Sequence, residues 1–168
     1  WQNNLIIGNP VTGIIHRDAL DVHGSTYQVK TLKDFVTCDD PWFRPVDIKL
    51  GPDGAIYIAD FYNKIIGHYE VDLKHPGRDR HRGRIWRIVY RGKKGDQIKP
   101  PAMIDLSKQS AQQLIQSLDH PNLTLRTLAT HQLADRFKSQ APKAIRNLFK
   151  SHHATPLQKV HGLWVIER

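Results

Sequence analysis

The spacing of hydrophobic and polar residues changes near residue 90, and this change divides the chain into two parts. Up to Tyr90, short apolar runs are separated by Gly, Pro, Asp and Asn, which is the pattern of short antiparallel strands with turns between them. After about residue 105, apolar residues recur at helical spacing instead. The chain is therefore predicted to be mixed, with β structure first and α structure second. The expected strands are Leu5–Ile7, Gly13–Arg17, Tyr27–Val36, Val46–Leu50, Ala55–Asp60, Ile65–Val71 and Arg84–Tyr90.

The expected strands form two groups within residues 1–90. Four of them lie within 46–90, which is the size of one blade of a β-propeller. The three earlier strands, within 1–36, make a half blade that lacks its innermost strand. A sheet cut open in this way exposes an edge. We therefore expect 1–90 to be the end of a propeller, and the chain to be an internal fragment of a longer protein.

The second part is predicted to begin after a linker at 91–105, which contains two Gly and two Pro and has no hydrophobic period. Ser107 and Ser110 are candidate helix N-caps. Residues 114–136 resemble residues 145–168, and each unit suggests two helices joined by a turn that contains a proline. Such hairpins stack because one alone cannot bury its apolar face. Residues 106–168 are therefore predicted to be HEAT-type helical repeats.

Composition adds a strong basic bias to this picture. The formal net charge is +9, and nine Lys or Arg residues against one acid lie in 74–94. Such a segment is either a solvated basic face or a contact surface for a polyanion. We expect no specific binding of nucleic acid.

Several kinds of chemistry are absent from the sequence. Cys38 is the single cysteine, so an internal disulfide, a cysteine-based zinc site and a C-x-x-C-H haem attachment are excluded within these residues. The ten histidines lack the spacing of a metal site. No nucleophile motif or metalloprotease motif is present, and no apolar run reaches the length of a membrane span. We therefore expect neither a metal site nor a catalytic residue in this chain.

Two segments resemble a known family. They are DPWFRPVDIKLGPDGAIYIADFYN (40–63) and HPGRDRHRGRIWRI (75–88). Together they resemble the membrane-bound dehydrogenases of planctomycetes and verrucomicrobia. Those proteins join a sorbosone- or glucose-dehydrogenase-like propeller to HEAT repeats, usually followed by a cytochrome c domain. The resemblance implies an exported or periplasmic protein whose partners are its own further blades, further HEAT repeats and a cytochrome c domain. It also implies that the parent protein uses a quinone and haem c, with neither held by this fragment.

Blade topology and the resemblance together indicate a candidate site. In the related quinone-dependent sugar dehydrogenases, two arginines before the P-D-G turn contact the carboxylates of the cofactor. Arg44 matches the first of these, but Val46 stands at the second, and Val11 stands where a lysine is expected. The candidate cofactor- or substrate-binding residues lie in loops expected to share one face, opposite the face of the 72–83 loop. They are Arg44, Trp42, Asn9, Asp60 and Asn63.

Structural roles compete with these functional ones. Arg44 could instead pair with Asp40 or Asp47 to fix its loop. Asp60 and Asn63 are also typical turn residues, and Asp53 in the G-P-D-G segment is expected to be one.

Three functional hypotheses follow. The first is a non-catalytic part of an exported oxidoreductase-like protein of the sugar or aldehyde dehydrogenase type. The second is a propeller and HEAT module that binds a protein or a glycan. The third, which has the least support, is polyanion binding through the basic segment 74–94.

Overall fold

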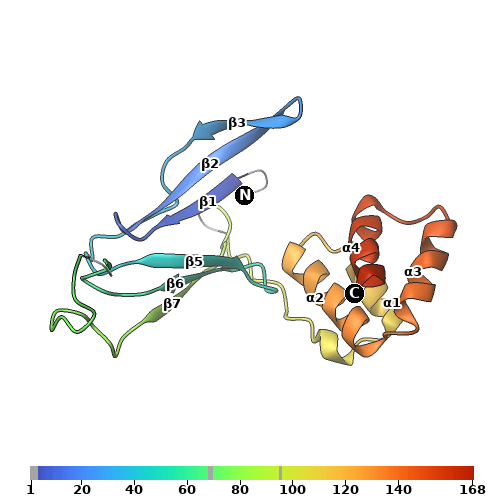
Figure 1. The fold of residues 1–168 in the computed structure, drawn as a ribbon. Coiled ribbons are helices and arrows are strands. Elements are labelled where there is room, and N and C mark those ends of the chain that lie inside the picture. Colours follow the sequence, from blue (N-terminus) through green and yellow to red (C-terminus); the bar gives the residue numbers. More distant parts are fainter. Residues whose placement is uncertain (1–3, 68–69, 95) are drawn as a thin grey trace. The chain divides into compact units, whose positions relative to one another are not determined.

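The computed structural model describes residues 4–67, 70–94 and 96–168. The chain divides into two compact units, which are described separately (Figure 1). The β unit comprises residues 1–49 and 56–89. The helical unit comprises residues 90–168 together with the turn 50–55.

The first sheet of the β unit is antiparallel and contains four strands, in the order β1-β2-β3 with a short β4 also on β2. Gly13, with a φ of 68°, makes the tight turn between β1 and β2 because this left-handed conformation suits glycine. The sheet consists of β1 (Asn4–Asn9), β2 (Ile14–His23), β3 (Thr26–Thr31) and β4 (Val36–Thr37).

The second sheet contains three strands in chain order, β5 (Pro45–Leu50), β6 (Ile56–Asp60) and β7 (Arg84–Ile88). Strands β6 and β7 are antiparallel, with Asp60 opposite Arg84. An apolar cluster joins this sheet to the first one, and its fully buried members are Ile15, Phe43 and Ile58. The two sheets therefore share one small core.

The prediction of propeller blades is wrong. The β unit consists of two small open sheets, and no closed propeller forms. The sequence predicts four strands within 46–90. The structure has three there, because Ile65–Val71 forms no strand in its described part. Positions 68 and 69 of that segment lie outside the described residues. Strand β6 therefore pairs directly with β7, and residues 61–83 form one long connection between them.

The side chain of Arg78 contacts the described part of the 65–71 segment, which is not in the sheet. Its guanidinium donates hydrogen bonds to the carbonyls of Gly67, Val71 and Asp72. Backbone acceptors that a strand would offer to a neighbouring strand are thus satisfied by one side chain. A hydrophobic pattern alone does not reveal this competition.

The helical unit begins with a 3-10 helix, η1 (Leu106–Lys108), whose N-cap is Asp105. Ser110 is confirmed as the N-cap of α1, where it forms a capping box with Gln113. Ser107 lies inside η1 and caps no helix. The α-helices are α1 (Ala111–Ser117), α2 (Leu123–Arg136), α3 (Ala141–Lys150) and α4 (Pro156–Glu167).

The prediction of HEAT-type repeats is also wrong, although the order of β structure before α structure is confirmed. The four helices pack around one apolar core that draws residues from all of them. They are unequal, with 7, 14, 10 and 12 residues in chain order, so the unit is a single cluster. At Gly162 the backbone of α4 approaches α3 so closely that a Cβ there would lie 2.8 Å from Ile145.

A buried histidine links α2 to α4. The Nε2 atom of His161 accepts a hydrogen bond from Nε of Arg126 (3.1 Å), and its Nδ1 atom lies 3.2 Å from Oγ1 of Thr130. Because Arg126 only donates, His161 must be neutral to accept this bond. Burial, together with the charge of Arg126, lowers the pKa of His161 below its ordinary value of 6.5. Folding of this unit therefore favours the deprotonated imidazole.

We expect the helical unit to lose stability as the pH falls below about 6.5, because protonation of His161 in the unfolded chain is not matched in the folded one. The stabilisation is fully present above that pH and disappears as the pH falls through the lower pKa of the folded state. NMR titration of the imidazole signals should give His161 a pKa below the ordinary value of 6.5.

His161→Gln, which does not titrate, should flatten the pH dependence of unfolding between about pH 7.5 and 5. The control His131→Gln, at an exposed site of α2 outside this contact, should leave the hydrogen bond between Arg126 and His161 in place. A His161 that titrates at or above the ordinary pKa would contradict this account of the α2–α4 contact.

Candidate functional site

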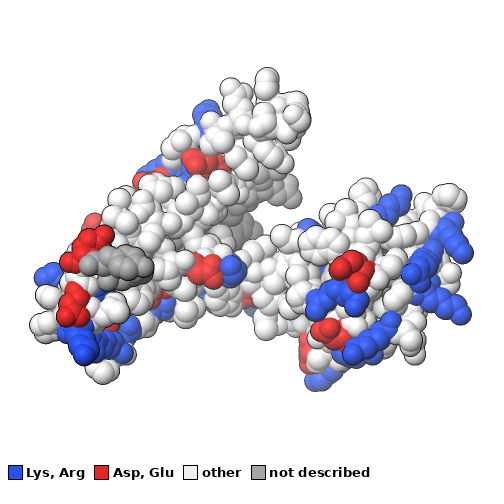
Figure 2. Space-filling view, viewed as in Figure 1, with Lys and Arg blue, Asp and Glu red and all other residues white. Residues whose placement is uncertain are grey.

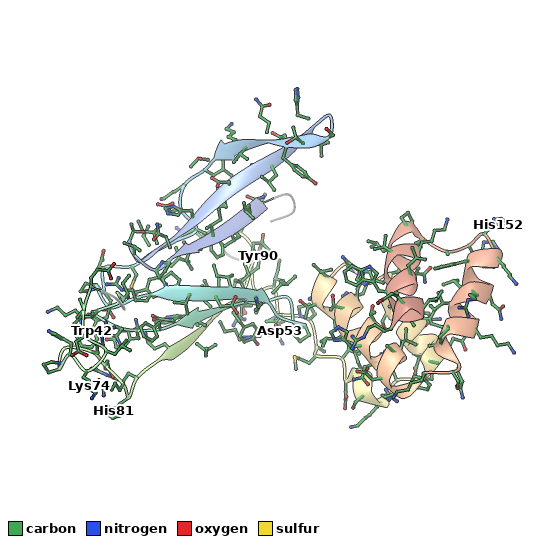
Figure 3. The ribbon with its side chains drawn as sticks, in the orientation of Figure 1. Trp42, Asp53, Lys74, His81, Tyr90 and His152 are labelled. Carbon is green, nitrogen blue, oxygen red and sulfur yellow. The ribbon has the colours of Figure 1, made fainter. Side chains whose placement is uncertain are left out.

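Two loops meet at one end of the β unit, where Trp42, Lys74 and His81 lie (Figure 3). The segment around Phe43 comes before β5, and residues 61–83 connect β6 to β7. The backbone joins them directly, because Phe61 N–H donates to Arg44 O (2.9 Å) and Asn63 N–H donates to Trp42 O (3.0 Å). The expectation that the 72–83 loop lies on the opposite face is therefore wrong, since without a strand at 65–71 both loops lie at the same end of the sheet.

The carboxylate of Asp60, at the end of β6, is the centre of this loop cluster. Its side chain is fully buried and accepts four hydrogen bonds. Oδ1 accepts from the backbone N–H groups of Arg44 (2.8 Å) and Tyr62 (2.9 Å). Oδ2 accepts from Nε of Arg84 (2.7 Å) and Nε1 of Trp86 (3.1 Å). One side chain thus fixes both loops and the start of β7.

Burial alone would raise the pKa of Asp60, because it disfavours the charged form. The hydrogen bonds from Arg44, Trp86, Arg84 and Tyr62 outweigh this effect, and the pKa of Asp60 lies below its ordinary value. The network therefore favours the ionised form of Asp60, which acts as a structural group.

Arg84 extends the network outward. Its Nη1 atom donates to Asp40 (3.2 Å), and its guanidinium carbon lies 3.7 Å from the centre of the Tyr62 ring. Tyr62 has a φ of 50°, a conformation uncommon for a residue other than glycine. Its ring lies 5.5 Å from that of Trp42, centre to centre. The Arg84 guanidinium and the rings of Tyr62 and Trp42 thus form a cationic and aromatic layer.

Arg82 completes this layer and marks its exposed side. Its guanidinium carbon lies 5.0 Å from the centre of the Trp42 ring, and its Nε atom donates to Asp79. The Asp79 side chain is 5 % exposed, whereas that of Arg82 is 60 % exposed. Backbone donation from His81, opposed by burial but aided by Arg82, lowers the pKa of Asp79.

The buried amide of Asn63 holds this loop in place. It donates to Asp79 O (2.7 Å), and its oxygen accepts from Ile65 N–H (3.2 Å). Asn63 is thus a positioning residue.

An open cavity of about 530 Å³ lies beside these groups. This volume falls in the range of small-ligand sites. Its chemistry combines one indole ring with several cations and a single acid. The lining residues are Trp42, Lys64, Pro76, Gly77, Arg78, Asp79, His81 and Arg82.

The predicted site residues divide into two groups in the structure. Arg44, Trp42, Asp60 and Asn63 do come together, but only Trp42 lines the cavity. Asn9 uses its side chain to accept from the N–H groups of Val11 and Thr12 within its own turn.

Neither structural partner proposed for Arg44 is found. Asp40 pairs with Arg84, and Asp47 pairs with Lys49. Asp53 is a turn residue as expected, since its side chain accepts from Ala55 N–H (3.1 Å).

The residues around Arg44 do not fit the quinone site that the resemblance implies. Nη1 of Arg44 donates to Phe43 O, so the guanidinium does not offer its full fork to a carboxylate. Its Nε atom is buried and has no partner among the described residues, but it is a single donor. Val11 and Val46 are exposed apolar side chains where basic ones are needed.

Most arginines of the basic segment make contacts within the β unit. Arg78 and Arg80 donate to loop carbonyls, Arg82 pairs with Asp79, Arg84 pairs with Asp60, and Arg87 donates to the Tyr57 hydroxyl. The segment is therefore largely structural. The role of Arg84 could not be predicted from the sequence, because the expected strand Ile65–Val71 would have separated Arg84–Tyr90 from Ala55–Asp60.

Among the described residues, no group of three or more His, Cys, Asp or Glu side chains could hold a metal ion. None of the helices described is both long and apolar enough to span a bilayer.

Comparison with known proteins gave one match. Residues 1–92 match the domain of unknown function DUF7133. No curated protein and no solved structure matches the chain.

We expect Asp60→Ala to lower the free energy of unfolding of the β unit by about 3 kcal/mol, because it leaves Nε of the half-buried Arg84, the indole N–H of Trp86 and two backbone N–H groups without this acceptor. The matched control is Asp47→Ala, which removes an exposed ion pair to Lys49 and should change stability by about 0.5 kcal/mol or less. Chemical denaturation of both variants measures the difference. Equal effects would show that Asp60 is not the centre of the loop cluster.

Proposed function

The chain belongs to the DUF7133 family, and because residues 1–92 include the whole β unit, we propose that the function of the family resides in that unit. In this proposal the chain is the non-catalytic, ligand-binding part of an exported oxidoreductase-like protein. The cavity beside Trp42 binds a small anionic ligand.

The observation that supports this proposal most strongly is the fixed positive charge around the cavity. Arg78 is anchored by three loop carbonyls, so its charge stays in place. Arg82 uses only Nε for Asp79 and keeps its terminal nitrogens for another acceptor. Lys64 is exposed and has no side-chain partner among the described residues. Preorganised cations of this kind favour carboxylate or phosphate groups.

The acid in the cavity does not cancel this charge. Asp79 already accepts from the backbone N–H groups of His81 (2.8 Å) and Arg82 (3.1 Å), as well as from the Arg82 side chain. Its oxygens are thus occupied by the loop. An incoming anion would therefore meet donors rather than free acceptors.

The oxidoreductase part of the proposal is supported by the resemblance and by where its motif residues lie. Apart from Lys64, every residue that lines the cavity belongs to one of the two motif segments, 40–63 and 75–88. Two separate segments that share a family resemblance thus line one cavity.

Neutral glycan binding, the alternative function, has less support here. Glycan sites commonly use an open aromatic face, but the guanidinium of Arg82 lies over the ring of Trp42. A charged ligand would use this guanidinium, whereas a neutral sugar would have to displace it. The geometry therefore favours an anion.

We expect this chain to bind citrate or inorganic phosphate more tightly than neutral glucose, with NMR shift changes at Trp42 and His81. The double variant Lys64→Gln/Arg82→Gln should weaken citrate binding by about tenfold or more, the scale of one or two lost hydrogen bonds to charged groups. Arg44→Gln is the control, because Arg44 does not line the cavity. Loss of binding in the control alone would place the site at Arg44 instead.

The oxidoreductase role is tested in the longer protein by dye reduction with aldoses and aldehydes as substrates. The same double variant should raise KM with little change in kcat, because these side chains bind and do not react. A collapse of kcat at unchanged KM would contradict a non-catalytic role.

A further inference from the structure

A second gathering of positive charge lies in the helical unit, far along the sequence from the segment 74–94. Between Asp135 and Glu167 the chain contains no acidic residue. Blue side chains follow the outer side of α3 in Figure 2. The five cations of this stretch, apart from Arg136, are Lys138, Lys143, Arg146, Lys150 and Lys159.

The amphipathic pattern of α3 explains why these charges are on the surface. Ala141 and Ile145 are fully buried against the helical core. Lys143, Arg146 and Lys150 are exposed and follow one another at spacings of three and four residues. Residues at these spacings lie on one face of a helix. The exposed face of α3 is therefore a row of cations.

These cations differ from three arginines of the helical unit that do have partners. Arg126 donates to His120 O, Arg136 donates to Leu106 O, and Arg168 pairs with Asp135. Within the described part of the unit, none of the five cations of the acid-free stretch makes a side-chain hydrogen bond or an ion pair. Like charges placed together without counter-charges repel one another, and an external anion would relieve this repulsion.

We propose that the exposed face of α3 is a docking surface for an acidic polypeptide segment. The three cations on this face are about 4.5 and 6 Å apart along the helix axis. Carboxylates repeated every three or four residues on a partner helix have the same spacing. The partner is thus defined by a row of Asp or Glu side chains.

Other polyanions fit this face less well. The α3 helix exposes no large apolar or aromatic side chain. Single-stranded nucleic acid binds through base stacking on aromatic rings as well as through charge. Peripheral membrane helices insert apolar side chains between the headgroups. A surface with cations alone favours a partner that offers only carboxylates.

A fluorescently labelled, glutamate-rich helical peptide of about 20 residues is a suitable probe. It should bind the whole chain, and binding should weaken steeply between about 50 and 200 mM salt because exposed charges are screened. The variant Lys143→Glu/Arg146→Glu/Lys150→Glu should weaken binding by about tenfold or more. The matched control Lys30→Glu/Lys33→Glu/Lys94→Glu makes the same change in net charge at exposed sites of the chain.

The control should stay within about twofold of the unaltered chain. The milder variant Lys143→Gln/Lys150→Gln, checked for helix content by circular dichroism, should give an intermediate loss if the triple variant fails to fold. Equal losses in the α3 variants and the control would overturn the proposal in favour of a net-charge effect. Tighter binding to anionic vesicles or to an oligonucleotide than to the peptide would also overturn it.

Discussion

The β unit depends on one buried carboxylate. Asp60 ends β6, and its two oxygens hold the backbone of both loops and the first residues of β7. A charge in such a place is tolerated only when every lone pair has a donor. The loops cannot rearrange separately, because each movement would leave part of this carboxylate unsatisfied. Asp60 therefore determines the shape of the neighbouring cavity, although it does not line the cavity itself.

This arrangement gives most of the positive charge in the segment 74–94 a structural role. Charge that looks like a surface for polyanions in the segment 74–94 is mostly used to fold the connection between β6 and β7. Part of the remaining external charge lies at the cavity, near Lys64 and Arg82, and another part lies on the outer face of α3. The two surfaces belong to different units and suit different anions, one compact and the other extended.

Local patterns predicted much of the secondary structure but not the way in which it assembles. The order of β before α structure and the Ser110 cap followed from spacing and from capping chemistry. The propeller and HEAT architectures did not, because they required Ile65–Val71 to form a strand and the helices to form equal repeats. The competing contacts of Arg78 are long-range and leave no periodic signal. Among the residues selected from the sequence, Trp42 lines the cavity and Asp60 anchors the loops, whereas the contribution of Arg84 and of the other cavity residues is visible only once the loops are placed together.

The pairing of Asp60 with Arg84 has one further consequence, for how this fold can change during evolution. The ends of the 61–83 connection are tied together by adjacent strands and by an ion pair at their junction. The entropy of closing a longer loop rises only slowly with its length. Insertions within this connection would thus leave the sheet almost untouched. Homologous proteins could therefore carry different residues in this connection and bind different ligands, while the sheet stays the same.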